Sequence, residues 1–262
     1  MTEQQIRFND GAAYERMMGT WSRLAGMVFL DWLAPRSGLR WIDVGCGNGA
    51  FTELIVERCA PAEVQGIDPS DGQLAFARTR PTTGIAQFQR GDAMELPFLS
   101  HRFDAAVMAL VIFFVPDPGK GLAEMVRVVT AGGLVAAYAW DIPGGGFPLQ
   151  PIQTEMFAMG FPPARPPSAD ISRAEALQDL WTSAGLEKVE MRKIEVQRTF
   201  ADFDDFWTTA MLAPSTGPTV ASMPPDDAAL LKSRVRERLP ADAAGRITTG
   251  AFANAVRGSV PA

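Results

Sequence analysis

The chain has 262 residues, of which 47% are hydrophobic and 21% are charged, a composition typical of one globular domain with a sizeable core. Its formal net charge of -6 argues against a nucleic-acid partner, because attraction to a phosphate backbone needs clustered Lys and Arg side chains. The longest apolar run, residues 105–115, is too short to cross a bilayer, which predicts a soluble protein without a membrane partner.

The N-terminal sequence MTEQQIRFND lacks the apolar stretch of a secretory signal peptide, which favours a cytoplasmic location. Residues 10–33 predict two helices that are broken near Gly19. In the second of these helices, large apolar side chains recur on one face: Trp21, Leu24, Val28 and Trp32. We interpret this face as core packing and expect residues 1–38 to form a helical cap.

Residues 39–141 alternate short β-like runs with amphipathic stretches, the pattern of parallel strands with helices on both faces of a sheet. The predicted strands are residues 39–44, 63–68, 85–90, 103–110 and 134–140. A helix should follow the first strand, because Phe51, Ile55 and Cys59 share one face. That helix would hold Cys46 and Cys59 beyond disulfide reach, as expected of reduced thiols inside a cell.

Cap and turn residues mark the later helices of this region. Ser70 and Gln73 have the spacing of a capping box, and Asp117-Pro118 has the N-cap and first-turn residues that begin a helix. The buried stripe of the latter helix is predicted to be Leu122, Met125, Val126 and Val129. Gly132-Gly133 is then expected to turn the chain into the fifth strand.

Residues 142–170 are rich in Gly and Pro and end in FPPARPPS, which fits neither a helix nor a central strand. We expect a lid loop there, because regular structure resumes at once with a helix that points Leu177 and Trp181 inward. Residues 171–262 should complete the sheet, with a strand near 189–196, helices around 203–212 and 226–239, and a strand near 251–256. The basic cluster of Arg234, Arg236 and Arg238 is interpreted as a solvated helix face.

The stretch WIDVGCGNGA, residues 41–50, fits two kinds of cofactor. As G-x-G-x-x-A it matches the fingerprint of enzymes that bind NAD, and as D-x-G-x-G it fits a different nucleotide-like ligand. Gly45 and Gly47 lack Cβ atoms and would let the backbone approach either ligand, with amide groups at the helix start facing it. The loop by itself leaves both interpretations open.

Three acidic residues stand at or just after the ends of the first three predicted strands, where ligands bind in an open parallel sheet: Asp43, Asp68 and Asp92. Asp68 follows Gly49 at the spacing of an acid that accepts ribose hydroxyls. An acid beside the loop would repel a pyrophosphate and attract the ammonium of a methionine moiety, and Asp92 suits an adenine amino group. The competing interpretation is that Asp43 caps backbone amides and Asp92 only starts a turn.

Five motifs in order carry a family resemblance: WIDVGCGNGAF, GIDPSDGQLAFAR, RGDAMELPF, HRFDAAVMALVIFFVPDP and EMVRVVTAGGLVAAYAWD. With them, residues 39–141 resemble the class I S-adenosylmethionine-dependent methyltransferases, in particular the small-molecule branch similar to the ubiquinone and menaquinone biosynthesis methyltransferases. The resemblance implies an α/β, Rossmann-like, doubly wound sheet of seven strands, mostly parallel with an antiparallel last strand. Residues 1–262 would then be one methyltransferase domain with its cofactor-binding core at 39–141.

The resemblance also implies S-adenosylmethionine as the cofactor and no metal. Matched position by position, the residues that would line its methionine end are Asp43, Gly45, Cys46, Gly47 and, through its backbone, Leu110. Those at the ribose and adenine would be Asp68, Pro69, Ser70, Asp92 and Ala93. The N-terminal helix would add Tyr14 and Trp21.

The expected acceptor is a small, partly apolar molecule that is methylated by in-line displacement. The end of the fourth strand lacks the Asn/Asp-Pro-Pro-aromatic motif of amino-methylating enzymes, and residues 112–114 would form an apolar floor unless they pack in the core. His101 lies just before that strand, about 25 Å from the predicted site, so we do not expect it to act as a base. Tyr14 and Asp141 are better placed, and no catalytic residue is assigned. An NAD(P)-dependent oxidoreductase and a non-catalytic S-adenosylmethionine-binding protein are the alternative functions.

Overall fold

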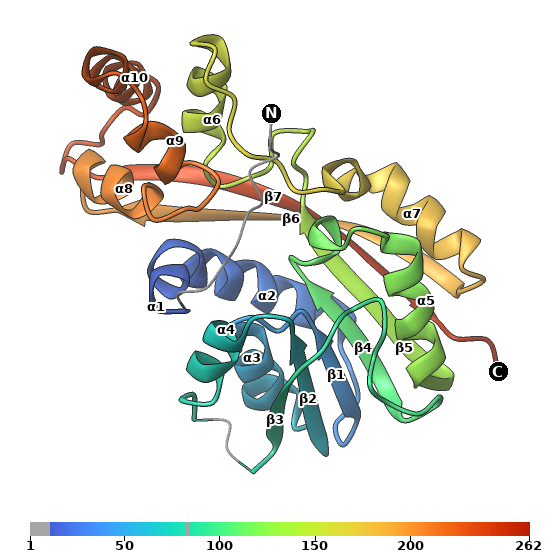
Figure 1. The fold of residues 1–262 in the computed structure, drawn as a ribbon. Coiled ribbons are helices and arrows are strands. Elements are labelled where there is room, and N and C mark those ends of the chain that lie inside the picture. The colour runs from blue at the N-terminus through green and yellow to red at the C-terminus, as the bar shows by residue number, and fades with distance from the viewer. Residues whose placement is uncertain (1–10, 82–83) are drawn as a thin grey trace.

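Seven strands form one sheet in the computed structural model, which describes residues 11–81 and 84–262 (Figure 1). The strands are β1 (Arg40–Val44), β2 (Glu63–Asp68), β3 (Ala86–Arg90), β4 (Phe103–Ala109), β5 (Val129–Trp140), β6 (Glu187–Phe200) and β7 (Ile247–Ser259). Their order is β3-β2-β1-β4-β5-β7-β6, and β7 is antiparallel to both of its neighbours, whereas the other pairs are parallel. The predicted α/β sheet with a reversed last strand is confirmed. The expectation about a signal peptide falls on residues 1–10, outside the described part.

Helices cover both faces of the sheet (Figure 1). α2 (Thr20–Leu33), α3 (Ala50–Cys59) and α4 (Asp71–Ala77) lie on one face, and α5 (Pro118–Val128) and α7 (Ala174–Ser183) lie on the other. Two predicted N-caps form, since Ser70 Oγ accepts from the Gln73 N–H and Asp117 Oδ1 accepts from the Lys120 N–H. The caps begin α4 and α5 beyond the carboxyl ends of β2 and β4, the edge where the candidate site lies.

The N-terminal helical segment is continuous, unlike the predicted pair of helices. α1 (Gly11–Tyr14), a π-helical turn η1 (Glu15–Gly19) and α2 follow one another directly, so Gly19 ends a π turn instead of breaking the helix. The buried face of α2 also lies beside the predicted one. Trp21, Ala25 and Phe29 are buried, whereas Leu24, Val28 and Trp32 are partly exposed.

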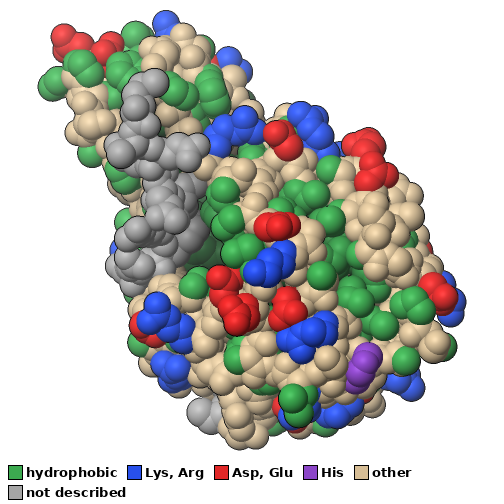
Figure 2. All heavy atoms as spheres, turned by 45° about the vertical axis from the view of Figure 1, so that its right-hand side comes forward, with side chains coloured by type: hydrophobic (Ala, Val, Ile, Leu, Met, Phe, Trp, Pro, Cys, Tyr) green, Lys and Arg blue, Asp and Glu red, His purple; other side chains and the backbone are tan. Residues whose placement is uncertain are grey.

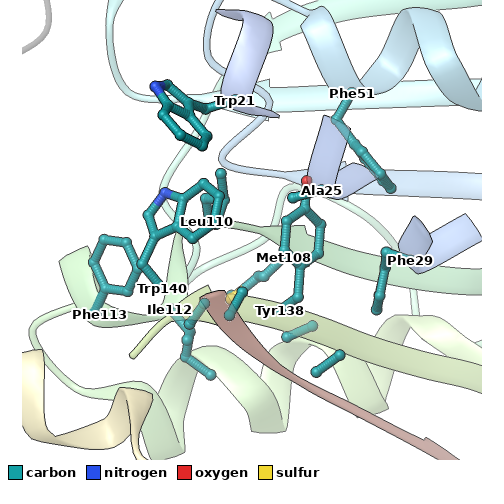
Figure 3. Close-up of a cluster of buried hydrophobic side chains, with 14 of the residues drawn as sticks. Trp21, Ala25, Phe29, Phe51, Met108, Leu110, Ile112, Phe113, Tyr138 and Trp140 are labelled. Carbon is teal, nitrogen blue, oxygen red and sulfur yellow. The ribbon is translucent and has the colours of Figure 1, made fainter. Parts of the chain in front are cut away.

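Aromatic packing explains which face of α2 is buried (Figure 3). Phe29 packs against Tyr138 of β5 and Phe51 of α3, with ring centroids 4.6 Å and 6.0 Å apart. Trp21 meets Trp140, the last residue of β5, edge-on at 6.4 Å. Aromatic pairs at these spacings stabilise beyond the area they bury, so they fix the N-terminal helix over the carboxyl end of β5.

β5 and the strands after it are longer than predicted. β5 begins at Val129, immediately after α5, so Gly132-Gly133 lies within the strand and does not turn the chain into it. A register shift against β4 and a φ of +72° at Gly132 accommodate the irregularity. β6 and β7 pair from Glu187–Ser259 to Phe200–Ile247. Polar residues near the ends of this ribbon, such as Glu187, Thr199 and Thr248, interrupt the apolar periodicity from which strands are predicted.

A layer of helices lies at the far end of the β6–β7 ribbon (Figure 1): α6 (Gln150–Ala158), α8 (Phe203–Ala210), α9 (Gly217–Ala221) and α10 (Pro225–Arg238). The predicted lid loop therefore contains a helix, which flanking Gly and Pro residues concealed. Glu155 of α6 is buried and forms ion pairs with Arg234 and Arg238, while Arg236 pairs with Asp204 of α8. The basic cluster interpreted as a solvated face thus ties α10 to its neighbours.

Candidate active site

The glycine loop follows β1 at the carboxyl edge of the sheet. Gly45, Gly47 and Gly49 have φ of +76°, +52° and +77°, a region that strains any residue with a side chain. At Gly45 space is restricted as well, because a Cβ atom would lie 2.4 Å from the Val111 side chain. At Gly47 the nearest atom to such a Cβ would be Gln73 Oε1, at 3.9 Å. The loop therefore packs closely at Gly45 and leaves room at Gly47.

The amide groups of this loop bind the protein itself. Gly45 and Cys46 donate to the Ile67 carbonyl of β2 at 2.7 Å and 3.0 Å, and Gly47 donates to Asp68 Oδ2 at 2.9 Å. These three N–H groups precede the start of α3 at Ala50, and they tie the loop to β2 instead of facing a ligand. A pyrophosphate needs free N–H donors, so the arrangement disfavours a dinucleotide.

Asp43 lies in β1 and is completely buried. Its Oδ2 accepts from Thr52 Oγ1 of α3 at 2.6 Å, and its Oδ1 has no hydrogen-bond partner among the described residues. Burial raises the pKa of this carboxyl to about 7, against the opposing effect of the Thr52 bond. Asp43 therefore does not cap the loop amides and instead offers one unpaired oxygen in a buried setting.

Asp68 ends β2 with both carboxylate oxygens engaged. Oδ2 accepts from Gly47, and Oδ1 accepts from the Ser70 N–H at 2.8 Å. Burial raises the pKa of Asp68, and the two backbone bonds counteract that rise. The Ser70 N–H donates to Asp68 and is therefore not available to the Gln73 side chain. Of the predicted capping box, only the bond from the Gln73 N–H to Ser70 Oγ forms.

The Gln73 side chain is left without partners. It is 2% exposed, and neither Nε2 nor Oε1 is hydrogen-bonded within the described structure. An unsatisfied buried polar group costs roughly 1–3 kcal/mol, so such groups call for a ligand, water or functional role. The sequence interpretation treated Gln73 as a capping residue only. Its place beside Gly47 makes it a binding-site candidate that spacing alone did not reveal.

Asp92 and Ala93 follow β3 at the same edge. Asp92 Oδ1 accepts from the Met94 N–H at 2.8 Å, and the Asp92 carbonyl accepts from the Glu95 N–H at 3.1 Å. The turn of the competing interpretation is therefore present. The Asp92 side chain is exposed, so its second oxygen faces no steric barrier to a ligand.

A polar cluster ties the N-terminal turn to the glycine loop. Asn48 Nδ2 donates to the Gly11 carbonyl at 3.3 Å and to Glu15 Oε2 at 2.7 Å. Arg80 forms ion pairs with Glu15 and with Glu53 of α3, and only 10% of its side chain is exposed. Charged hydrogen bonds shielded in this way are strong, so they hold the N-terminal turn over the loop. No local sequence pattern indicates this cluster, in which Glu15 and Arg80 lie 65 residues apart.

An apolar cavity lies beside the end of β4. Aromatic side chains form much of its wall: Tyr14, Phe113, Phe114, Trp140 and Phe147. Leu110 also lines it and has a φ of +63°, a strained conformation that turns the chain from β4 into the 3-10 helix η2 (Ile112–Phe114). Ile112 packs in the core, and Trp21 lies behind Trp140 (Figure 3).

Residues 42–137 match the family model described as a methyltransferase domain. They include the glycine loop, the three acids and the end of β4. These residues form a class I S-adenosylmethionine-dependent methyltransferase domain. The family and cofactor predicted from the motifs are thereby confirmed.

Over 96 residues, this methyltransferase domain is 41% identical to a protein of Oryza sativa subsp. japonica, 2-methyl-6-phytyl-1,4-hydroquinone methyltransferase 2, chloroplastic. The matched segment covers 37% of this chain and 28% of that protein. The domain is 33% identical over 107 residues to a demethylmenaquinone methyltransferase of Desulfitobacterium hafniense, covering 39% and 42%. The chain thus spans less than half the length of these two relatives. Phosphoethanolamine N-methyltransferase 2 of Haemonchus contortus, solved with S-adenosyl-L-methionine, shares the fold with a TM-score of 0.60 at 18% identity, covering 96% of this chain and 56% of that one.

Of the residues considered as bases, His101 and Asp141 lie outside the cavity lining, whereas Tyr14 lines the cavity. His101 is at the amino end of β4, as predicted, with Nδ1 3.1 Å from the Val129 carbonyl. Asp141 accepts from the Gly144 N–H at 2.7 Å and from Asn254 Nδ2 at 3.0 Å, so it stabilises the turn after β5. The described residues that line the cavity include no His, Asp or Glu.

Charges of both signs share the drawn face, and both cysteines are buried. Figure 2 shows acidic and basic side chains interspersed on the drawn face, without a continuous basic stripe. Cys46 and Cys59 are buried free thiols, as predicted, and burial raises the pKa of both. In residues 11–81 and 84–262 no acidic, His or Cys cluster could hold a metal ion. Over the same ranges, no helix is both long enough and apolar enough to cross a membrane.

Proposed function

We propose that this chain is an enzyme that transfers a methyl group from S-adenosylmethionine to a small, largely apolar acceptor. The observation that carries the proposal is the cavity beside Leu110, which adjoins the end of β4 near the glycine loop. Its walls are largely apolar and aromatic with a few polar groups, as is usual for small-molecule sites. Much of its lining follows residue 137, outside the segment matched by the family, so acceptor choice is a property of this chain.

The methionine end of the cofactor would lie between β1 and β4. Asp43 has an unpaired oxygen there, and a nearby cation would favour its ionised form. The Leu110 carbonyl would accept from the ammonium group, while the Leu110 N–H donates to the Tyr138 carbonyl at 2.8 Å. Further contacts would come from Gly45, Cys46, Gly47 and Tyr14, with Trp21 acting behind Trp140.

The ribose and adenine would lie farther along the same edge. Asp68 would accept from ribose hydroxyls, sharing the oxygens that now receive backbone amides. Gln73 would supply both a donor and an acceptor, and a bound ligand would satisfy its buried amide. The remaining contacts would come from Pro69, Ser70, Asp92 and Ala93.

When bound, the cofactor supplies a methyl group on a sulfonium, whose carbon–sulfur bond breaks as the acceptor attacks in line. The chain contributes alignment, which is worth roughly 7–11 kcal/mol in well-oriented pairs, and aromatic walls that exclude water. No His, Asp or Glu of the described residues lines the cavity, so the acceptor atom must be nucleophilic without a base from these walls. Burial raises the pKa of Tyr14, so its phenol stays protonated and can orient the acceptor as a donor.

Calorimetry with S-adenosylmethionine and with NADH tests the cofactor. We expect S-adenosylmethionine to bind and Asp68→Asn to weaken it by roughly tenfold, the loss of hydrogen bonds to a charged group. Asp71→Asn is the matched control, because this neighbouring carboxylate is 74% exposed. Binding of NADH alone would contradict the proposal.

A methyl-transfer screen separates an enzyme from a non-catalytic binding protein. The two relatives are named for a hydroquinone and for demethylmenaquinone, so aromatic ring acceptors are the first class to test. Transfer of a labelled methyl group to any of them would support catalysis. Tight cofactor binding without transfer to any acceptor in a broad metabolite panel would favour the non-catalytic alternative.

A further inference from the structure

One charged side chain stands in the lining of the apolar cavity. Besides apolar residues, the lining consists, among the residues that the structure describes, of Tyr14, Gln153, Ser215 and a single cation, Arg165. The chain carries a net charge of -6, so a lone Arg beside an otherwise uncharged cavity creates a local preference for an anion.

Arg165 lies on a segment that is fixed to the cavity wall. It stands between the two proline pairs of FPPARPPS, which restrict the backbone on either side. At the end of this segment, Ser168 donates from its N–H to the Phe113 carbonyl at 3.0 Å and from its Oγ to the Val115 carbonyl at 2.8 Å. Phe113 itself lines the cavity. The position of Arg165 is therefore set in advance, which lowers the entropy lost on binding.

The guanidinium of Arg165 has unused donors. Within the described structure its ion-pair partner is Asp170, at 3.8 Å, which is longer than a hydrogen bond. The Asp170 side chain is 81% exposed, and a pair this long and this exposed contributes little. The Arg165 side chain is itself about half exposed, so its planar N–H fork can receive a carboxylate or similar anion at the mouth of the cavity.

The cavity has a charged side at Arg165 and an apolar side at Ala213 and Pro214. Where the cavity borders Ala213 and Pro214, it adjoins a second hollow that has no charged side chain in its described lining. Trp207 and Met211 are among the apolar residues there. A ligand with one apolar and one anionic end would thus place its anion at Arg165 and its apolar end toward Ala213.

We propose that the acceptor is an amphipathic organic acid, with an aromatic or similarly apolar body in the cavity and an anionic group held by Arg165. This inference rests on the proposed function and names the chemical class of its acceptor. Phe113, Phe114 and Phe147 contact the body, and Gln153 adds a neutral hydrogen-bonding group to the wall. A cationic acceptor is repelled by Arg165, and a neutral one leaves its donors unused.

Two fluorescent probes that differ by one anionic group test this assignment. 8-Anilinonaphthalene-1-sulfonate and N-phenyl-1-naphthylamine share their aromatic skeleton, and only the first carries a sulfonate. Titrations compare the full chain with Arg165→Gln and with the control Arg173→Gln, an exposed arginine outside the cavity lining. Arg165→Gln should weaken the sulfonate probe by roughly tenfold and leave the neutral probe within about twofold, while Arg173→Gln changes neither.

Equal losses for both probes, or equal effects of the two arginine variants, overturn the assignment, and so does failure of both probes to bind. Ala213→Trp locates the probes, because a large side chain at this position fills the border between the two hollows. Full binding of the sulfonate probe to folded Ala213→Trp also overturns it. Calorimetry with S-adenosylmethionine tests the proposed function independently. Intact cofactor binding with a negative probe result would overturn only the assignment of an acidic acceptor, whereas absent cofactor binding would overturn the proposed function.

Discussion

Thr52 donates a 2.6 Å hydrogen bond to Asp43, and the other carboxylate oxygen of Asp43 has no partner in the described chain. Burial raises the pKa of Asp43 from 3.8 to about 7. The folded protein therefore keeps a proton that the unfolded chain releases between about pH 4 and pH 7. Because the native state binds more protons there, the free energy of unfolding falls as the pH rises through this window.

Asp43→Asn should remove most of that pH dependence from the cofactor-free protein. The amide still accepts from Thr52 but cannot ionise. Between pH 5 and pH 8, the free energy of unfolding of the wild type should fall by roughly 3 kcal/mol more than that of the variant. Urea denaturation at the two pH values measures this difference, with exposed Asp179→Asn as the control. Parallel pH profiles for wild type and Asp43→Asn would show that Asp43 titrates normally.

Gln73→Leu should weaken cofactor binding without lowering the stability of the cofactor-free protein. Removing an unpaired buried amide in favour of an apolar side chain of similar size is neutral or stabilising, so the melting temperature of the cofactor-free protein should not fall. The affinity for S-adenosylmethionine should fall by roughly tenfold through the lost hydrogen bonds. Thermal melts and calorimetry give the two readouts, and exposed Gln178→Leu is the control. Unchanged affinity in Gln73→Leu would exclude this residue from the cofactor site.

The elements predicted well from the sequence are those determined by residues that lie close together in the chain. Ser70 and Asp117 cap α4 and α5 because each cap needs only the N–H three residues later, within one helical turn. The glycine pair Gly132-Gly133 indicated a turn, but the Gly132 N–H donates to the Val260 carbonyl and the Gly133 carbonyl accepts from the Val260 N–H, so the pair stays inside the strand. α6 was missed because its stability comes from packing and from Glu155 against α10, not from its own sequence.

The candidate site, too, could be predicted only in part from the sequence. The ends of β1, β2 and β3 converge because parallel strands share one carboxyl edge, so the acids after them could be placed from spacing. The hydrogen-bond partners of these side chains could not be predicted from the sequence. Asp68 takes amides from Gly47 and Ser70, and this leaves Gln73 unpaired. Arg80 is held by Glu15, 65 residues away, and the segment of Arg165 is held by the bonds of Ser168 to Phe113 and Val115, none of which a local pattern encodes.

Gly45→Ala should destabilise the chain more than Gly38→Ala does. Both glycines have a φ of +76°, so both variants bear the cost of a left-handed residue. At Gly38 no atom lies within 4 Å of an added Cβ, whereas at Gly45 the Val111 side chain lies 2.4 Å away. The excess loss in free energy of unfolding should be about 1–3 kcal/mol, the usual cost of overpacking. Urea denaturation measures it, and Val111→Ala in the Gly45→Ala background should recover part of the loss. Equal losses at the two glycines would show that the loop shifts to absorb the clash.

Glu15→Gln should loosen the N-terminal turn over the glycine loop and speed cofactor release. The substitution removes one ion pair of Arg80 but leaves its 2.7 Å pair with Glu53 in place, so the core of the cluster keeps its charge balance. Because the Arg80 side chain is only 10% exposed, the lost interaction is better shielded than a surface pair. We expect the dissociation rate of S-adenosylmethionine, measured by stopped-flow displacement, to rise several-fold. Glu57→Gln is the matched control, since Glu57 pairs with Arg23 where both side chains are more than 40% exposed. A dissociation rate that is the same in Glu15→Gln, Glu57→Gln and the wild type would show that the turn does not retain the cofactor.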